Sequence, residues 1–287
     1  MKKILVTGGY GQLALCLRDL IEATDGIKAV YPDIDDLDIT DATAVSAYFG
    51  QQGITHCINC AAYTAVDQAE SEAERAASIN VTGAANLASA CAASGAVLVH
   101  ISTDFVFDGA SSRPYTENDP TAPLGVYGQT KRDGERAIEE LTEKHYIIRT
   151  SWLYSEYGKN FVRTMLHLAA TRDQIQVVAD QVGTPTYAGD LAAFILYALE
   201  QEPPRYGYYH FSDEGVASWY DFAKAVFDLS GTEIACLPIP TEAFPTPARR
   251  PAYSVMDKSK TKAFYEQPIP YWRDSLKRCL DRLKATA

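Results

Sequence analysis

The N-terminal segment constrains the fold of this chain more than any other stretch. Residues 3–6 read as a short apolar strand, and a turn with glycines at positions 8, 9 and 11 follows directly. Apolar side chains then recur at helical spacing, at Leu13, Leu17, Leu20 and Ile21. Glycines let a backbone approach a pyrophosphate closely, and the free N–H groups of a helix N-terminus favour its negative charge. The segment therefore predicts a dinucleotide-binding turn at Gly8 and Gly11, against the alternative of a plain structural turn.

Strands and helical runs alternate from residue 4 to residue 150, which is typical of a doubly wound parallel sheet. Further strands are expected at Ile27–Tyr31, Thr55–Cys60, Ala96–Ile101 and His145–Thr150. We therefore predict an α/β protein with a dinucleotide-binding Rossmann domain over residues 1–150, completed by a helix near residues 188–200. Residues 151–287 mix helical runs, short strands and proline-rich connections, and they are expected to form a smaller mixed α/β substrate-binding domain.

The charge and the cysteines exclude several classes of protein. The net charge is −11 and no basic block occurs, which argues against nucleic acid or an anionic membrane surface as a partner. No apolar run reaches membrane-spanning length, and Met1-Lys2-Lys3 leads straight into a strand, so we predict a cytoplasmic protein. Cys57 and Cys60 lie three apart in a strand and face opposite sides of it, and the other four cysteines are scattered. We expect reduced thiols and no metal site.

An acidic loop follows the second predicted strand. Asp33 stands where a carboxylate meets the adenine ribose hydroxyls in dinucleotide-binding folds. Such a carboxylate repels a 2′-phosphate and so favours NADH, although any one acid of residues 33–38 can equally be a solvated surface charge. Asn80 interrupts an alanine-rich helical run, either as a functional helix-breaker or as a local turn.

Tyr127 and Lys131 are the candidate catalytic pair. They lie four residues apart at the head of the amphipathic run 128–143, which puts both side chains on one face of a helix. An ammonium group beside a phenol is expected to lower the phenol's pKa and make it a usable general acid. Thr103 and Asp104 come directly after the strand that precedes this helix. The alternative is an aromatic core residue followed by a surface lysine.

Taken together, these segments resemble the extended short-chain dehydrogenase/reductases, and within them the chain is similar to the dTDP-4-dehydrorhamnose reductases. The resemblance spans nearly the whole chain. It rests on six stretches that occur in order: residues 7–13, 59–67, 102–107, 127–131, 149–154 and 180–186.

The resemblance implies roles for particular residues. Tyr127 would donate the proton, Lys131 would bind the nicotinamide ribose and tune the phenol, and Thr103 would hydrogen-bond the sugar and the tyrosine. Asp104 and Trp152 would contact the sugar. The cofactor, NADPH or NADH, would meet the pyrophosphate-binding residues Gly11, Gln12 and Leu13 and the adenosine-side residues Asp38, Ile39, Ala61, Ala62 and Tyr63. Leu15 and Cys16 stand where some members carry a glutamate of a metal-bridged dimer, so monomer and homodimer both remain open.

The expected activity is reduction of dTDP-4-dehydro-β-L-rhamnose to dTDP-β-L-rhamnose. A nucleotide-sugar epimerase or 4,6-dehydratase is the first alternative, but dehydration needs an acid pair after the Ser/Thr, and here Phe105 follows Asp104. A non-catalytic cofactor-binding regulatory subunit is the second alternative. The candidates for binding the nucleotide phosphates are Arg149, Lys159, Arg163, Arg249 and Arg250.

Overall fold

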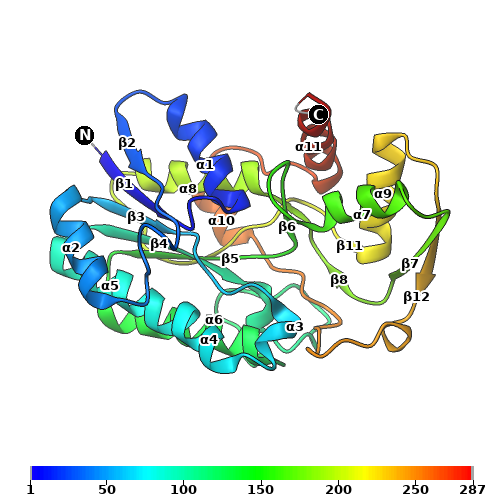
Figure 1. The fold of residues 1–287 in the computed structure, drawn as a ribbon, viewed down its shortest axis with the longest axis horizontal. Helices are drawn as coiled ribbons and strands as arrows, with labels where there is room; N and C mark the ends of the chain where they lie inside the picture. The colour runs from blue at the N-terminus through cyan, green and yellow to red at the C-terminus, as the bar shows by residue number, and fades with distance from the viewer. Residues whose placement is uncertain (1, 286–287) are drawn as a thin grey trace.

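The computed structural model describes residues 2–285 and is built around one six-stranded sheet (Figure 1). Its strands run in the order β10-β5-β4-β3-β1-β2, and every neighbouring pair is parallel. The strands are β1 (Lys2–Thr7), β2 (Ile27–Val30), β3 (His56–Asn59), β4 (Val97–Thr103), β5 (His145–Thr150) and β10 (Gly207–His210). The predicted doubly wound parallel sheet is confirmed.

Helices cover both faces of this sheet (Figure 1). On one face α1 (Gln12–Glu22) and α8 (Ala188–Glu200) pack over Ile4, Val6 and Ile58. On the other, α2 (Ala42–Gln52), α5 (Ala84–Ser94) and α6 (Val126–Leu141) pack over the alternate side chains Leu5, Cys57 and Leu98. Because both faces are buried, the middle positions of the strands are mainly apolar, as in Ile4-Leu5-Val6 and Val97-Leu98-Val99.

The two sides of the sheet are wound in opposite directions from β1. The chain passes from β1 to β2 at one edge and then returns to β3 on the other side of β1. Ligands of such sheets bind at this switch point, outside the carboxyl ends of the strands. The glycine turn at residues 8–11 and the segment 60–64 lie at that place.

A second hydrophobic core occupies the right side of Figure 1. It is built by α7 (Phe161–Ala169), α9 (Trp219–Ser230) and α11 (Trp272–Ala285), and by the paired strands β7 (Gln174–Val178) and β12 (Ala235–Ile239). Two short pairs complete it: β6 (Leu153–Tyr154) with β9 (Thr186–Tyr187), and β8 (Val182–Gly183) with β11 (Ala217–Ser218). The division at residue 150 stays a prediction, and the structure adds that β10 and α8 return to the first unit.

Short elements fill the remaining connections. They are α3 (Val66–Ala69), α4 (Ala73–Ala77), a π-helix at Ser78–Gly83, α10 (Ser259–Phe264) and 3₁₀ turns at Asp104–Val106 and Thr241–Ala243. All six cysteines are free thiols, and Cys60 alone among them is only half-buried. Within residues 2–285, none of the helices combines the length and the apolar character needed to cross a bilayer.

A buried ion pair joins α6 to β5. The Arg149 guanidinium donates from Nε and Nη2 to the two carboxylate oxygens of Glu135, at 2.9 and 2.8 Å. Ser102 Oγ on β4 also donates to Glu135 Oε1. The Arg149 guanidinium lies 4.8 Å from the ring centre of Tyr208 and 5.2 Å from that of Phe107. Arg149 is therefore committed to the core, which removes it from the candidates for binding nucleotide phosphates.

We expect Arg149→Met to lower the free energy of unfolding by about 3–5 kcal/mol, because it leaves the Glu135 carboxylate buried without its counter-charge. Chemical denaturation measures the change. Lys224→Met is the matched control, since its ammonium lies 4.0 Å from Asp228 in an exposed pair and such pairs contribute little. Equal losses in the two variants would contradict this account.

Candidate active site

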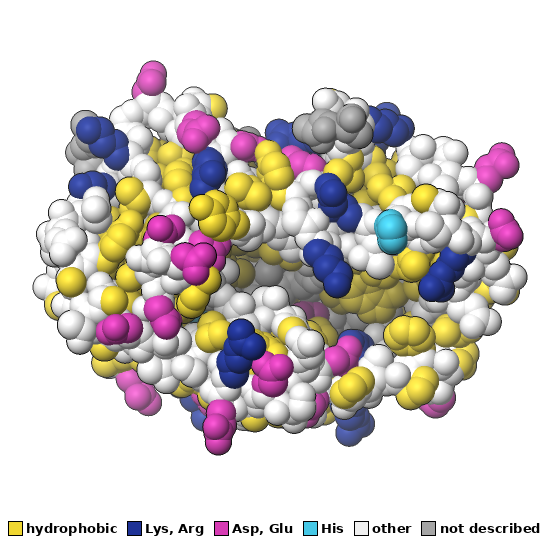
Figure 2. Space-filling model, viewed as in Figure 1, with side chains coloured by type: hydrophobic (Ala, Val, Ile, Leu, Met, Phe, Trp, Pro, Cys, Tyr) yellow, Lys and Arg dark blue, Asp and Glu magenta, His cyan; other side chains and the backbone are white. Residues whose placement is uncertain are grey.

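A cavity of about 820 Å³ lies at the carboxyl ends of the central strands. Figure 2 shows it as the hollow in the middle of the molecule's face, with acidic side chains along its left rim and basic ones along its right. Its walls come from the glycine turn, the loop after β2, the segment after β3, the ends of β4 and β5, and α6. Trp219 of α9 adds a wall from the second core. The cavity is thus lined by residues that pack on both hydrophobic cores.

The glycine turn fits a dinucleotide. Gly11 precedes the first residue of α1, and no described side chain caps this helix end, so its N–H groups are free for a pyrophosphate. Gly9 lies so close to β2 that an added Cβ would sit 2.0 Å from the carbonyl oxygen of Tyr31. The Gly9 N–H donates to the Pro32 carbonyl at 3.1 Å. Gly8, Gly11, Gln12 and Leu13 all line the cavity, as the sequence predicts.

The acidic loop closes the left end of the cavity. Asp33 Oδ2 accepts the Tyr10 N–H at 3.0 Å, and Asp33 Oδ1 accepts the Ile34 N–H at 2.7 Å. The carboxylate therefore ties the glycine turn to the loop after β2. Asp38 and Ile39 also line the cavity. Asp33 is thus a wall residue in a defined place, and it is more than a solvated charge.

Only some of the adenosine-side residues predicted after β3 line the cavity. Ala61 and Ala62 line the cavity, but Tyr63 is turned away from it and buried. Its N–H donates to Asn80 Oδ1 at 2.9 Å, and its phenol donates to Glu72 Oε2 at 3.2 Å. The structure therefore does not bring Tyr63 together with the other adenosine-side residues.

Asn80 explains the break in the helical run. It sits in the π-helix at residues 78–83, where the wider turn lets its side chain leave the helix. Its amide nitrogen donates to the Tyr63 carbonyl at 3.2 Å and to Thr130 Oγ1 at 3.0 Å. Asn80 thus clamps the segment after β3 to α6, and it shapes the cavity wall without lining it.

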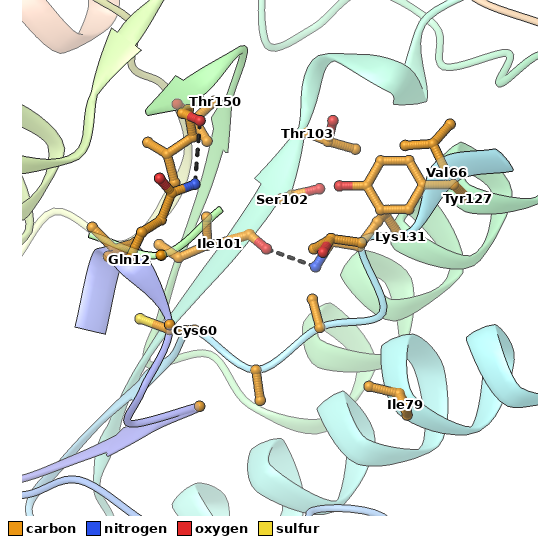
Figure 3. Close-up of a pocket in the computed structure, with 18 of the residues that line it drawn as sticks. Gln12, Cys60, Val66, Ile79, Ile101, Ser102, Thr103, Tyr127, Lys131 and Thr150 are labelled. Atoms are coloured by element: carbon orange, nitrogen blue, oxygen red, sulfur yellow. Dashed lines mark hydrogen bonds between the residues drawn. The ribbon is translucent and has the colours of Figure 1, made fainter. Parts of the chain in front are cut away.

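Tyr127, Thr103 and Asp104 meet at the end of β4, where Figure 3 shows the Tyr127 hydroxyl directed toward Ser102 and Thr103. Thr103 Oγ1 donates to Asp104 Oδ1 at 3.0 Å. Burial raises the pKa of Asp104 to about 6. Its other oxygen, Oδ2, is buried with no hydrogen-bond partner among the described residues. The Ser254 side chain also lowers the pKa of Asp104, so this oxygen fits a hydroxyl group, either that of Ser254 or one of a ligand.

Lys131 lies on the same face of α6 as Tyr127, but its ammonium is directed to β4 (Figure 3). It donates to the Ile101 carbonyl at 2.7 Å and lies 3.1 Å from His100 Nε2. Burial lowers the pKa of Lys131 to about 8. Burial also raises the pKa of Tyr127 to about 12, opposed by a hydrogen bond with Thr103. The expected lowering of the phenol's pKa by Lys131 is therefore wrong, because burial is the largest influence and the ammonium is directed to the Ile101 carbonyl.

Two glycines fix α6 against its neighbours. An added Cβ at Gly128 would lie 2.2 Å from the Phe105 carbonyl oxygen, and one at Gly134 would lie 2.2 Å from the Asn80 carbonyl oxygen. Real Cβ atoms do not approach backbone this closely, so the helix touches its supports through bare backbone. Tyr127 and Lys131 therefore project from a helix whose position is fixed by contacts at Gly128 and Gly134.

Trp152 lines the cavity with a backbone φ of +48°, a left-handed conformation that bulky residues rarely adopt. Its ring stacks on Trp219 with 3.6 Å between ring centres and 10° between planes. Trp219 was not predicted from the sequence. Nothing local marks it, since it belongs to a helix far along the chain.

Of the remaining candidate cations, Lys159 and Arg250 line the cavity. Arg250 is held by Asp67, with Nη2 2.8 Å from Oδ2. Among the described residues, Arg163 and Arg249 are not part of its wall, and Arg163 donates to the Glu156 carbonyl at 2.8 Å. Residues 2–285 contain no group of three or more His, Cys, Asp or Glu side chains placed to hold a metal ion.

The parallel sheet, the glycine turn at its switch point and the Tyr127–Lys131 pair beside it define a Rossmann-type short-chain dehydrogenase/reductase. The family model of the RmlD substrate binding domain matches residues 1–285. The chain therefore belongs to this family.

Known relatives are similar over nearly their whole length. A dTDP-4-dehydrorhamnose reductase of Aggregatibacter actinomycetemcomitans is 43% identical, and the match covers 96% of this chain and 98% of that protein. The dTDP-4-dehydrorhamnose reductase of Bacillus anthracis, solved in complex with NADP, is 40% identical with a TM-score of 0.95, covering 98% and 100% of the two chains. A probable dTDP-4,6-dihydroxy-2-methyloxan-3-one 4-ketoreductase of Streptomyces antibioticus is 41% identical over 95% of this chain and 92% of its own.

We expect Gly9→Ala to weaken binding of the reduced cofactor at least tenfold, because the new methyl group must push the turn away from Tyr31. Fluorescence titration with NADPH measures the dissociation constant. Gly50→Ala is the control, since an added Cβ there has open space on an exposed face of α2, and a helical alanine is favoured over glycine. A Gly9→Ala protein that binds as tightly as the control would contradict the assignment.

Proposed function

We propose that this protein is an NADPH- or NADH-dependent oxidoreductase that reduces dTDP-4-dehydro-β-L-rhamnose to dTDP-β-L-rhamnose, the last step of dTDP-L-rhamnose biosynthesis. The observation that carries the proposal is the meeting of Tyr127, Thr103 and Asp104 in one cavity with the glycine turn. Family membership along the whole chain supports the same reaction.

The cofactor would be held from the glycine turn to α6. Gly11, Gln12 and Leu13 would face its pyrophosphate, Asp33 and Asp38 its adenosine side, and Lys131 its nicotinamide ribose. When bound, the reduced nicotinamide supplies the hydride. The protein's own task is to orient the 4-keto sugar and to provide the proton.

Tyr127 is suited to that proton transfer. With a pKa raised to about 12, the phenol stays fully protonated at neutral pH, and an alkoxide is a strong enough base to take its proton. Tyr127 and Thr103 would donate hydrogen bonds to the oxygen at C4 as its charge develops. The charge left on the phenolate would be stabilised by Lys131 on the same helix face. Lys131 thus acts on the product of the transfer more than on the resting acid.

Asp104 and the indole pair would orient the sugar. Above a pH of about 6 Asp104 is a carboxylate, and its unpaired Oδ2 would accept a hydrogen bond from a sugar hydroxyl. Trp152, stacked on Trp219, would supply an apolar wall for the ring. Lys159 and Arg250 are the cations available to the nucleotide's phosphates.

The rival activities have weaker support. A dehydratase needs a second acid after Asp104, but Phe105 fills that position and lies edge-on to Tyr127 with 5.6 Å between ring centres. A regulatory subunit has no chemical need for Thr103, Tyr127 and Lys131 together. Net oxidation of the cofactor with the dTDP-linked 4-keto sugar, compared with its UDP and GDP counterparts, separates these activities. Catalysis without net oxidation would favour an epimerase.

The location and the assembly stay predictions. The sequence predicts a cytoplasmic protein and leaves open a monomer or a homodimer, with or without a metal bridge.

We expect Tyr127→Phe to lower kcat by roughly 10²–10⁴-fold, the usual scale for loss of a general acid, with cofactor affinity nearly unchanged. Steady-state assays of cofactor oxidation measure kcat, and fluorescence titration with NADPH measures the cofactor affinity. Tyr10→Phe serves as the control, because Tyr10 belongs to the glycine turn and its side chain is 69% exposed. Wild-type turnover in Tyr127→Phe would refute the mechanism.

We expect Asp33→Asn to raise the NADPH-to-NADH ratio of kcat/KM by about five- to tenfold. The change removes one negative charge near the 2′-phosphate, a repulsion of about 1 kcal/mol at 4 Å in water. The amide keeps an oxygen for the Tyr10 N–H. Steady-state kinetics with both cofactors measure the ratio, and Asp35→Asn, on the same loop but outside the cavity wall, should leave it unchanged. An unchanged ratio in Asp33→Asn would place the cofactor's ribose elsewhere.

A further inference from the structure

A buried ladder of polar side chains leads from Lys131 across the sheet. Thr7, Asn59 and His100 are directly opposite one another on β1, β3 and β4, so their side chains point to the same face. Each is no more than 2% exposed. Thr7 Oγ1 donates to Asn59 Oδ1 at 2.7 Å, Asn59 Nδ2 lies 3.0 Å from His100 Nδ1, and His100 Nε2 lies 3.1 Å from Lys131 Nζ. The reaction described above uses none of these three residues.

The proton count of the ladder depends on the charge of Lys131. His100 is neutral, because burial and the nearby lysine hold its pKa well below the usual value. A neutral imidazole has one N–H donor and one acceptor nitrogen. Where the Asn59 amide N–H donates to Nδ1, the ring proton is on Nε2 and faces Lys131. That arrangement suits only an uncharged amine, which has a lone pair to accept it.

An ammonium requires the opposite direction. It has donors only, so His100 Nε2 must accept and Nδ1 must carry the ring proton. Asn59 can meet this change, since a half-turn of its amide exchanges oxygen and nitrogen. The amide nitrogen then donates to Thr7 Oγ1, which also accepts the N–H of the cavity-lining Ala61 at 3.3 Å. Both directions pair Asn59, His100 and Lys131, whereas the Thr7 hydroxyl donates to Asn59 in the first direction and accepts from it in the second.

We propose that His100 is a positioning residue for Lys131, and that the Thr7–Asn59–His100 ladder reverses its hydrogen-bond direction when Lys131 gains or loses its proton. In the charged state His100 accepts from the ammonium and so stabilises the cation that the phenolate needs. The inference rests on the proposed function only for its kinetic consequence.

The other groups around Lys131 include two that also favour its charged form, since the Glu135 carboxylate raises the lysine's pKa and the Ile101 carbonyl accepts its N–H. On α6 the neighbours are Tyr127 and Glu135, and the Glu135 carboxylate is already occupied by Arg149 and Ser102. From β4 come His100 and the Ile101 carbonyl, and from the segment after β3 comes the Cys60 thiol. Asp104 stands beside Tyr127. Among these neighbours, His100 offers Nε2 as an acceptor to the ammonium. The hydrogen bond between Asn59 and His100 Nδ1 decides whether Nε2 is free to accept.

The first test needs no substrate. The full-length protein with ¹⁵N-labelled histidine is titrated from about pH 6 to about pH 10, a range that brackets the lysine's titration, and His100→Gln identifies the His100 signals. We expect a neutral ring throughout, with the proton on Nδ1 at low pH and on Nε2 at high pH. One tautomer across the whole range would overturn the proposal. This result holds or fails whatever sugar the enzyme reduces.

The second test is the pH profile of kcat/KM. Loss of the acceptor in His100→Phe should move the alkaline limb to lower pH by about one to two units, the scale of one hydrogen bond to a charged group. His100→Gln keeps an acceptor oxygen and should restore the limb. His145→Phe is the control, because His145 is also buried on the sheet but bonds to the Thr142 carbonyl. An unmoved limb in His100→Phe overturns the proposal.

A second variant keeps the proposal testable where His100→Phe does not fold. Asn59→Asp offers His100 Nδ1 only an acceptor, which fixes the ring proton there and leaves Nε2 to accept from the ammonium. The ¹⁵N signals of this variant should therefore show the ring proton on Nδ1 across the whole pH range. A ring proton that still moves to Nε2 at high pH would overturn the proposal even where His100→Phe is not recovered.

Discussion

The parallel alignment of β1, β3 and β4 is the constraint on which the site depends. It places three strand ends at one edge of the sheet, so that the glycine turn, the segment after β3 and Thr103 face one cavity. The contact of Gly9 with the Tyr31 carbonyl keeps the turn against β2. That contact is possible only because Gly9 has no side chain. The chemistry then requires only that α6 present Tyr127 and Lys131 to this edge.

Burial determines how the catalytic groups behave. It raises the pKa of Tyr127 and of Asp104, and it lowers the pKa of Lys131. All three changes favour the uncharged form of the group. The site therefore holds a neutral acid until a stronger base arrives, and neighbouring acceptors must stabilise the lysine's charge by accepting hydrogen bonds from it. In our proposal, the Thr7–Asn59–His100 ladder supplies one of these acceptors, His100 Nε2.

The sequence predicted what local spacing controls. The glycine turn, the alternating strands and the Tyr127–Lys131 pair follow from periods of two or nearly four residues, and the structure keeps them close to their predicted bounds. It did not predict what distant segments decide: β10 joins the main sheet, Trp219 stacks on Trp152, and Tyr63 turns toward Asn80. The error about the phenol's pKa has the same origin, because the depth of burial depends on the whole fold.

The two close backbone contacts of α6 limit where the site can adapt to a different sugar. With Gly128 and Gly134 seated on carbonyl groups, the helix can neither roll nor slide without a collision. The proton donor is thereby fixed against the end of β4. A sugar of different shape therefore has to be accommodated in the wall that packs on the second core, at residues such as Trp152 and Trp219.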